Sequence, residues 1–159
     1  MDTISTKKRR SIYPEYDAEY EDIQINGAFL DELLDRLFPG REIRGLVPPF
    51  SGWPSPAHEV EELWNRAERG RFEPTVLPLL ICPDDQAFDC MTIVTETSVS
   101  GPTISWIRFG LNRSWRYDNA AVIGQDVDWF DSQVAFTFKL EDYSEVFTNL
   151  RNMNLREAP

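Results

Sequence analysis

The sequence predicts an α+β fold, with an antiparallel sheet in the second half, two helices before it and one C-terminal helix after it. Apolar residues recur at helical spacing over residues 28–38 and again over 55–69. Between residues 75 and 138 the pattern changes to short β-rich runs separated by turn residues, and a helical stripe returns after Glu141. Strands joined in succession by short turns favour antiparallel pairing, and helices outside that run favour α+β over α/β.

The first predicted helix runs from Ala28 to Phe38 and is ended by Pro39 and Gly40. The second begins at Ser55 and Pro56, a good N-cap followed by a proline that fits the first helical position, and it ends before Gly70. Its acidic residues are expected to face solvent: Glu59, Glu61, Glu62 and Glu68. A short strand over 42–47 is expected between these helices. Phe50 and Trp53 in the proline-rich loop are expected to cap the core, with a contact site as the alternative.

The strand half is expected to contain strands over 75–82, 88–95, 103–111, 127–130 and 134–138. In the third of these, Trp106 and Phe109 are expected on opposite faces because side chains alternate along a strand. Residues 112–125 are expected to form a polar loop, and the last helix is expected to begin near Glu141 or Asp142.

The 159 residues fit one domain. We expect a single α+β domain over residues 26–155, preceded by a disordered or loosely docked tail over residues 1–25. The tail prediction rests on a basic block at 7–10 and a following acidic, tyrosine-bearing stretch, neither of which shows a helical or strand period.

The net charge of -11 and the pI of about 4.5 oppose binding to nucleic acid or to an anionic membrane. The same charge would steer a basic protein partner. The first residues lack the apolar segment of a secretory signal, and no apolar run is long enough to span a membrane, so we expect a cytoplasmic protein.

The sequence contains no recognisable catalytic motif, so we expect no enzymatic activity, no cofactor and no metal site. His58 is its one histidine, Cys82 and Cys90 lie in predicted strands, and no glycine-rich phosphate loop is present. Acidic residues do gather at two turns, 84–89 and 126–131, where paired carboxylates could act as acid and base or hold a cation. A small carboxylate-dependent enzyme therefore remains an alternative.

Protein binding is the favoured function, because Trp, Tyr and Arg dominate the energetics of protein interfaces and the predicted 112–125 loop carries such residues. Acidic residues flank them. The predicted partner-binding residues are Asp84, Asp85, Trp115, Tyr117, Asp118, Asp126 and Asp128.

Three segments carry a resemblance in style to the immunity proteins of bacterial polymorphic and contact-dependent toxin systems. These segments are PTVLPLLICPDDQAFDC at 74–90, WIRFG at 106–110 and VDWFD at 127–131. The resemblance implies a small, acidic, Trp-rich cytoplasmic α+β protein that binds a toxin domain and blocks it sterically. The other readings are a structural or adaptor subunit of a larger assembly and an acidic mimic of nucleic acid.

Overall fold

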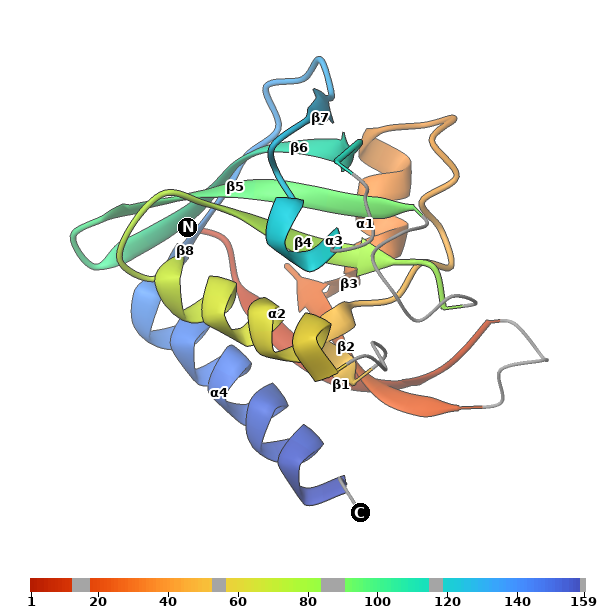
Figure 1. Ribbon diagram of the computed structural model, residues 1–159, viewed down its shortest axis with the longest axis vertical. Helices are drawn as coiled ribbons and strands as arrows, with labels where there is room; N and C mark the ends of the chain where they lie inside the picture. Colours follow the sequence, from red (N-terminus) through yellow and green to blue (C-terminus); the bar gives the residue numbers. More distant parts are fainter. Residues whose placement is uncertain (13–17, 53–56, 84–90, 115–118, 158–159) are drawn as a thin grey trace.

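The computed structural model describes the backbone of residues 1–12, 18–52, 57–83, 91–114 and 119–157. Its five-stranded antiparallel sheet has the order β4-β5-β6-β7, with β8 paired to β6 beside β7 (Figure 1). The strands are β4 (Thr75–Ile81), β5 (Thr92–Ser100), β6 (Thr103–Asn112), β7 (Val127–Trp129) and β8 (Phe136–Lys139). The predicted α+β class with an antiparallel sheet in the second half is confirmed.

A β-bulge in β6 corrects the predicted alternation of that strand. Glu96 pairs with Arg108 whereas Thr97 pairs with Trp106, so Ile107 is the extra residue on β6. Ile107 is exposed, and the shift returns Phe109 to the buried face that Trp106 already occupies. The prediction that Trp106 and Phe109 lie on opposite faces is therefore wrong, because a bulge inserts one residue into the period of two.

The predicted tail over residues 1–25 is wrong for the residues that the structure describes there. They form β1 (Ile4–Arg10) and β2 (Glu19–Ile25), which pair along their whole length, and β2 also pairs with β3 (Ala28–Phe29). Burial of Ile4, Ile23 and Ile25 attaches this small sheet to the core. The charges that made the segment look solvated are largely paired across the strands or buried.

The main helices are α1 (Leu30–Leu37), α2 (Ala57–Arg69) and α4 (Leu140–Glu157), which confirms two helices before the large sheet and one at the C-terminal end. α1 begins two residues later than predicted because β3 pairs with β2. The strand predicted over 42–47 reduces to one bridge between Val47 and Ile81. A short helix, α3 (Asn119–Val122), lies in the predicted 112–125 loop.

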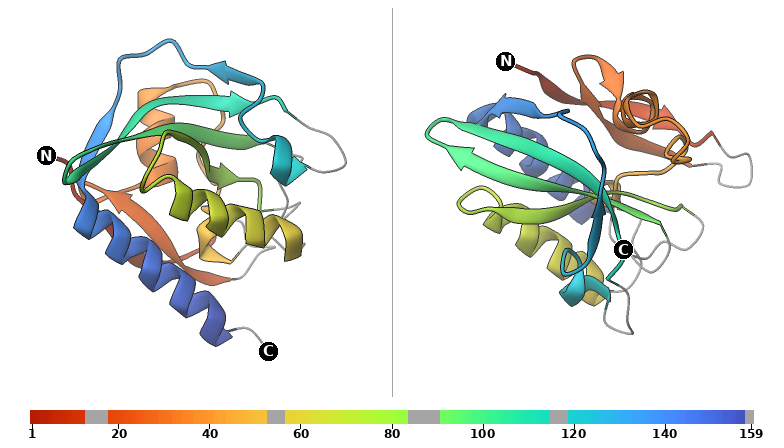
Figure 2. Two further views of the ribbon diagram at one scale, coloured as in Figure 1. Left: turned by 60° about the vertical axis from the view of Figure 1, so that its left-hand side comes forward. Right: turned by 90° about the horizontal axis from the view of Figure 1, so that it is seen from above.

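Helices α2 and α4 lie side by side on the same side of the molecule (Figures 1 and 2). The 3-10 turn η1 (Pro49–Ser51) places Phe50 between them, fully buried, which confirms its predicted capping role, whereas Trp53, for which the same role is predicted, lies outside the described residues. Phe50 makes edge contacts with Trp64 of α2 at 5.3 Å and with Phe147 of α4 at 4.8 Å between ring centroids. Both helices are therefore fixed against the same aromatic side chain.

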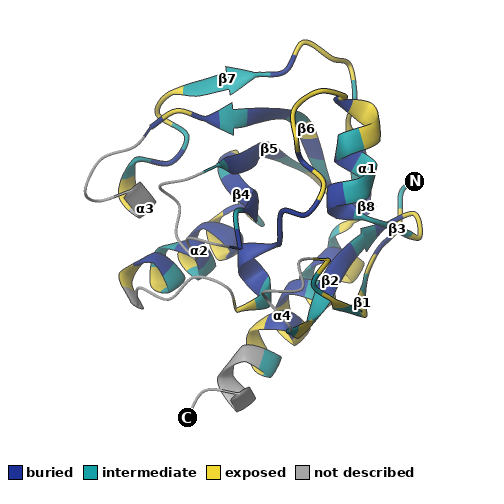
Figure 3. Ribbon diagram, turned by 90° about the vertical axis from the view of Figure 1, so that its right-hand side faces the viewer, coloured by how far each residue is buried: buried dark blue, intermediate teal, exposed yellow. Residues whose placement is uncertain are grey.

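A continuous chain of aromatic contacts carries the core from these helices to the large sheet. Phe147 contacts Tyr143, whose hydroxyl accepts a hydrogen bond of 3.2 Å from the indole of Trp106. Trp106 contacts Phe109 of the same strand, and Phe109 contacts Phe38 after α1. The outer surfaces of α2 and α4 remain exposed, as Figure 3 shows by colour. Of the acidic residues of α2 that are expected to face solvent, Glu61 and Glu68 are exposed and Glu62 is half-buried, but the prediction is wrong for Glu59, which is buried.

Candidate functional site

Five of the seven predicted partner-binding residues lie outside the described residues: Asp84, Asp85, Trp115, Tyr117 and Asp118. The structure places the other two, Asp126 and Asp128, at the β6–β7 end of the large sheet, far from α4 (Figure 1). Whether these seven residues bind a partner stays a prediction.

The carboxylate of Asp128 lies between two guanidinium groups. Its Oδ2 atom is 3.4 Å from Nη1 of Arg41 and 3.6 Å from Nη2 of Arg113. The Arg41 guanidinium also stacks over the ring of Phe130 at 4.3 Å. Asp126 is exposed, and its backbone oxygen accepts a hydrogen bond of 2.7 Å from the backbone N–H of Arg113. This end of the sheet is therefore a partly exposed ion-pair network, a type that contributes little to stability.

A second cluster of charges is buried between β1, β2 and α1. Nη1 of Arg9 donates to Asp22 at 2.9 Å and to Asp31 at 2.6 Å, and its Nη2 lies 3.3 Å from Glu32. The side chains of Asp22 and Asp31 are 0% and 1% exposed. The Arg9 guanidinium stacks over Phe29 at 4.4 Å. One cation thus faces two buried carboxylates.

Backbone donors complete the coordination of these two carboxylates. Asp22 accepts a hydrogen bond of 2.7 Å from the N–H of Ile23, and Asp31 accepts one of 2.9 Å from Gly45. Burial raises the pKa of Asp22 to about 6, and the hydrogen bond from Arg9 offsets only part of that rise. A raised pKa is a property of catalytic acids, but these carboxylates are closed to solvent and saturated with donors. We assign the cluster a structural role, fixing the small sheet to α1.

Other reactive groups do not assemble into a site in the described part of the chain. No group of three or more His, Cys, Asp or Glu side chains gathers there in an arrangement that could hold a metal ion. His58 is exposed, contrary to what a general base held in a pocket requires, and Cys82 is half-buried at the end of β4. None of the described helices combines the length and apolar character that a membrane span requires.

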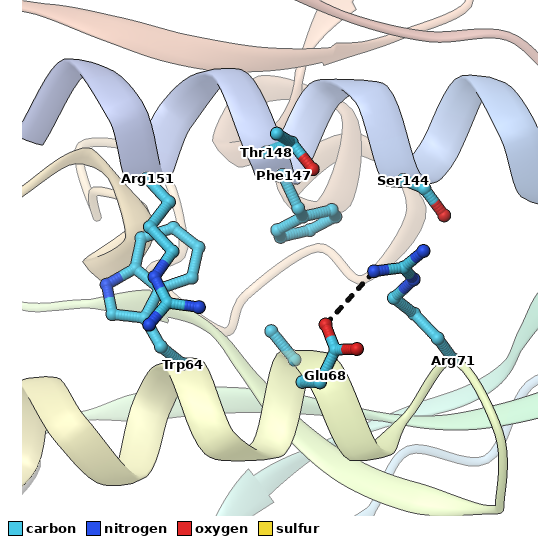
Figure 4. A pocket seen from close by; sticks show the side chains of 8 residues that line it. Trp64, Glu68, Arg71, Ser144, Phe147, Thr148 and Arg151 are labelled. Carbon is cyan, nitrogen blue, oxygen red and sulfur yellow. Dashed lines mark hydrogen bonds and ion pairs between the residues drawn. The ribbon is translucent and has the colours of Figure 1, made fainter.

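A groove lined by aromatic, polar and charged side chains lies between α2 and α4 (Figure 4). It encloses about 50 Å³. Ala67 and Phe147, both buried, form its apolar base, and Trp64 is half-buried at one end. Its remaining lining residues are polar or charged: Glu68, Arg71, Ser144, Thr148 and Arg151.

Two arginines flank the groove. Arg71 donates to Glu68 at 3.0 Å, while its Nε atom is buried without a hydrogen-bond partner. The Arg151 guanidinium lies 5.9 Å from the centre of the Trp64 ring and makes no ion pair within the described residues. Phe72, beside Arg71 in the chain, is 75% exposed. The groove therefore combines aromatic and arginine side chains, the types enriched at interface hot spots.

A wider and shallower hollow of about 310 Å³ lies where α2 and β4 meet the segment after α3. Its two arginines are already engaged. Arg66 donates to Glu62 at 2.9 Å and to the backbone oxygen of Val76 at 2.9 Å, and Arg69 lies 3.7 Å from the same Glu62. Because both arginines already have partners, we do not assign this hollow beside β4 as a ligand site.

Comparisons with protein-family models, with curated proteins and with solved structures found no match for this chain. The function proposed for this protein is therefore inferred from the residues of the chain itself.

Sequence reasoning did not identify the groove. In the sequence, Trp64 falls on the apolar stripe of the second predicted helix together with Val60, Leu63 and Ala67, and no pattern singles out Arg71, Phe72 or Arg151. The helical spacing of Trp64, Ala67, Glu68 and Arg71 is visible in the sequence, but the pairing of α2 with α4 is a long-range contact that the spacing does not encode.

Proposed function

We propose that the protein binds a basic protein partner without catalysing a reaction, and that binding neutralises the partner, as in the toxin–immunity pairs that its sequence resembles. Encounter in the cytoplasm fits this proposal. The observation that carries it is the groove between α2 and α4, with its aromatic and arginine side chains and with exposed acidic residues nearby on both helices. We call this surface the α2–α4 face.

Three acidic residues of this face lie within one helical turn of residues that line the groove. Glu61 precedes Trp64 by one helical turn on α2, and Glu141 and Glu145 lie within one turn of the groove residues on α4. All three side chains are exposed. Exposed acids at an interface rim speed the encounter with a basic partner, whereas desolvated aromatic anchors at the centre slow dissociation.

The charge of the whole chain supports the same partner chemistry. The net charge of -11 attracts basic proteins over distances longer than any contact and is screened by salt. Catalysis has weaker support, because Asp22, the carboxyl group whose pKa burial raises, is closed to solvent and already hydrogen-bonded to Arg9 and to the N–H of Ile23.

Affinity capture of the full chain from its native host, followed by binding measurements at low and high salt, tests the proposal. We expect a single stoichiometric basic protein whose activity is lost on binding and whose affinity falls as salt rises. Absence of such a partner, or a partner whose activity is unchanged in the complex, would contradict the proposal.

Charge reversal localises the contact. Glu61→Lys combined with Glu145→Lys should lower the association rate of the captured partner by about tenfold or more, because like charges at an interface slow encounter. Asp126→Lys combined with Asp131→Lys makes the same change of charge at exposed positions beyond β6 and is the matched control. An effect confined to the control pair would place the contact at the β6–β7 end of the sheet instead.

A further inference from the structure

The groove between α2 and α4 contains more hydrogen-bond donors than acceptors. Arg71, Arg151, Ser144 and Thr148 all present donor groups, and Glu68 is the one carboxylate among its lining residues. Glu68 is already hydrogen-bonded to Arg71. Within the described residues, neither Arg151 nor the hydroxyls of Ser144 and Thr148 have a side-chain partner.

This surplus is unusual for a chain with far more acidic than basic residues. The buried Nε atom of Arg71 has no acceptor, although buried donors are normally paired. Several other described guanidinium groups lie within 4 Å of a carboxylate, among them those of Arg9, Arg41, Arg66, Arg69, Arg108 and Arg113. Arg151 makes no ion pair within the described residues, as is also true of the exposed Arg36 and Arg44, but Arg151 alone of these three lines the groove, beside Trp64 (Figure 4).

The groove also selects against a cation. An incoming Lys or Arg side chain would meet two guanidinium groups, and the Arg151 guanidinium already lies 5.9 Å from the centre of the Trp64 ring. The volume of about 50 Å³ leaves room for a few heavy atoms and not for an aromatic ring. An apolar base beneath donor groups fits a carboxylate on a short aliphatic stem.

We propose that the groove receives an Asp or Glu side chain of the protein partner, held between Arg71 and Arg151 above Phe147. This inference rests on the proposed protein-binding function and specifies the contact at its centre. The complementary surface of the partner is then a carboxylate surrounded by basic residues, which face Glu61, Glu141 and Glu145. The groove would attract an acidic side chain of the partner, and the acidic residues near the groove would attract basic ones. This pattern fixes how the two proteins align and disfavours a partner whose binding surface is basic throughout.

Titration of the full chain with capped amino acids, followed by NMR, tests the groove without the partner. N-acetyl-glutamate methylamide should shift the Trp64 indole and Arg151 side-chain signals saturably, whereas the glutamine and lysine analogues should not. Inorganic phosphate is a further arm that separates a carboxylate site from a general anion site. No saturable shift, or an equal response to glutamine or to phosphate, would overturn the proposal.

Arg151→Gln should weaken binding of the glutamate probe at least about fivefold, because it removes a charged donor from the groove. Arg113→Gln makes the same change of charge at an exposed arginine of the β6–β7 end and should leave probe binding unchanged. Equal behaviour of the two variants would overturn the assignment.

The captured partner separates this inference from the function on which it rests. If the partner binds wild type and Arg151→Gln equally well, the carboxylate contact is wrong while the proposed function stands. If no partner is found but the glutamate probe binds selectively in the groove, the proposed function is wrong and the groove remains a carboxylate site.

Discussion

Arg9 and Arg151 carry the same guanidinium group in opposite surroundings. Arg9 is 9% exposed at its side chain and faces Asp22, Asp31 and Glu32, all within 3.3 Å. Arg151 is exposed beside Trp64, and no carboxylate pairs with it in the described residues. Around Arg9, three carboxylates share one guanidinium group. In the groove at Arg151, two guanidinium groups and two hydroxyls face the single carboxylate of Glu68.

The comparison distinguishes charged residues that stabilise the fold from charged residues that can bind a partner. A buried arginine whose donors are saturated stabilises the arrangement of the elements that supply its partners, here β1, β2 and α1. An exposed arginine without a partner, on an apolar base, gains most of its interaction energy when a ligand supplies the carboxylate. Variants of the two arginines and of their neighbours Asp22 and Glu68 test this distinction.

Arg9→Met should destabilise the protein by about 3–5 kcal/mol, because it leaves the buried carboxylates of Asp22 and Asp31 without their cation. Urea denaturation measures this change in the free energy of unfolding. Arg10→Met, one residue further along β1 at a side chain that is 61% exposed, is the control and should cost at most about 1 kcal/mol. Equal costs for the two variants would contradict the structural role of Arg9.

Stability should depend on pH through Asp22. Its pKa is raised from 3.8 to about 6 by burial, so the folded state binds more protons than the unfolded state between these values. The free energy of unfolding should therefore fall as pH rises from about 4 to about 6, by at most about 3 kcal/mol at 1.36 kcal/mol per pKa unit, and level off above.

Comparison with Asp22→Asn isolates this contribution, because the other carboxylates titrate in both proteins. Urea denaturation at a series of pH values should show a wild-type slope in this window that is absent in the variant. A wild-type stability that rises relative to the variant between pH 4 and pH 6 would show that Arg9 stabilises the ionised form of Asp22 more than burial destabilises it.

Glu68→Gln should strengthen binding of the glutamate probe in the groove by about twofold to fivefold. Glu68 now competes for Arg71 and repels an incoming carboxylate, and this partly exposed pair contributes little to stability. NMR titration measures the change in affinity. Weaker probe binding in this variant would mean that Glu68 positions Arg71 rather than competes for it.

Arg151→Gln should change the free energy of unfolding by less than about 0.5 kcal/mol, since its guanidinium makes no ion pair in the described residues. Urea denaturation of Arg151→Gln and of Arg9→Met under the same conditions compares the two changes in the free energy of unfolding. A cost near that of Arg9→Met would place Arg151 among the structural arginines and remove it from the proposed site.

The order of helices and strands could be predicted from periodicity, because the stripes of α1, α2 and α4 and the runs of β4 to β8 are local patterns. The small sheet could not be predicted, since β1 and β2 place charged residues where a buried strand is expected to be apolar. Arg9 and Asp22 are buried only because they meet Asp31, which lies 22 and 9 positions away from them in the chain.

The candidate site shows the same limit of sequence reasoning. Acidic residues and tryptophans were visible in the sequence, but their partners were not, and Asp128 is held by Arg41 and Arg113 from distant positions. Conversely, Arg151 could not be singled out from the sequence, because only the packing of α4 beside α2 places it at a groove next to Trp64.

Hydrogen exchange of the chain with and without its captured partner tests the central claim most directly. If the partner binds the α2–α4 face, hydrogen exchange should slow on binding in residues 61–71 and 141–151, and the exchange rate of residues 126–131 should stay unchanged. Slower exchange confined to residues 126–131 would contradict the assignment of this face and return the contact to the β6–β7 end of the sheet.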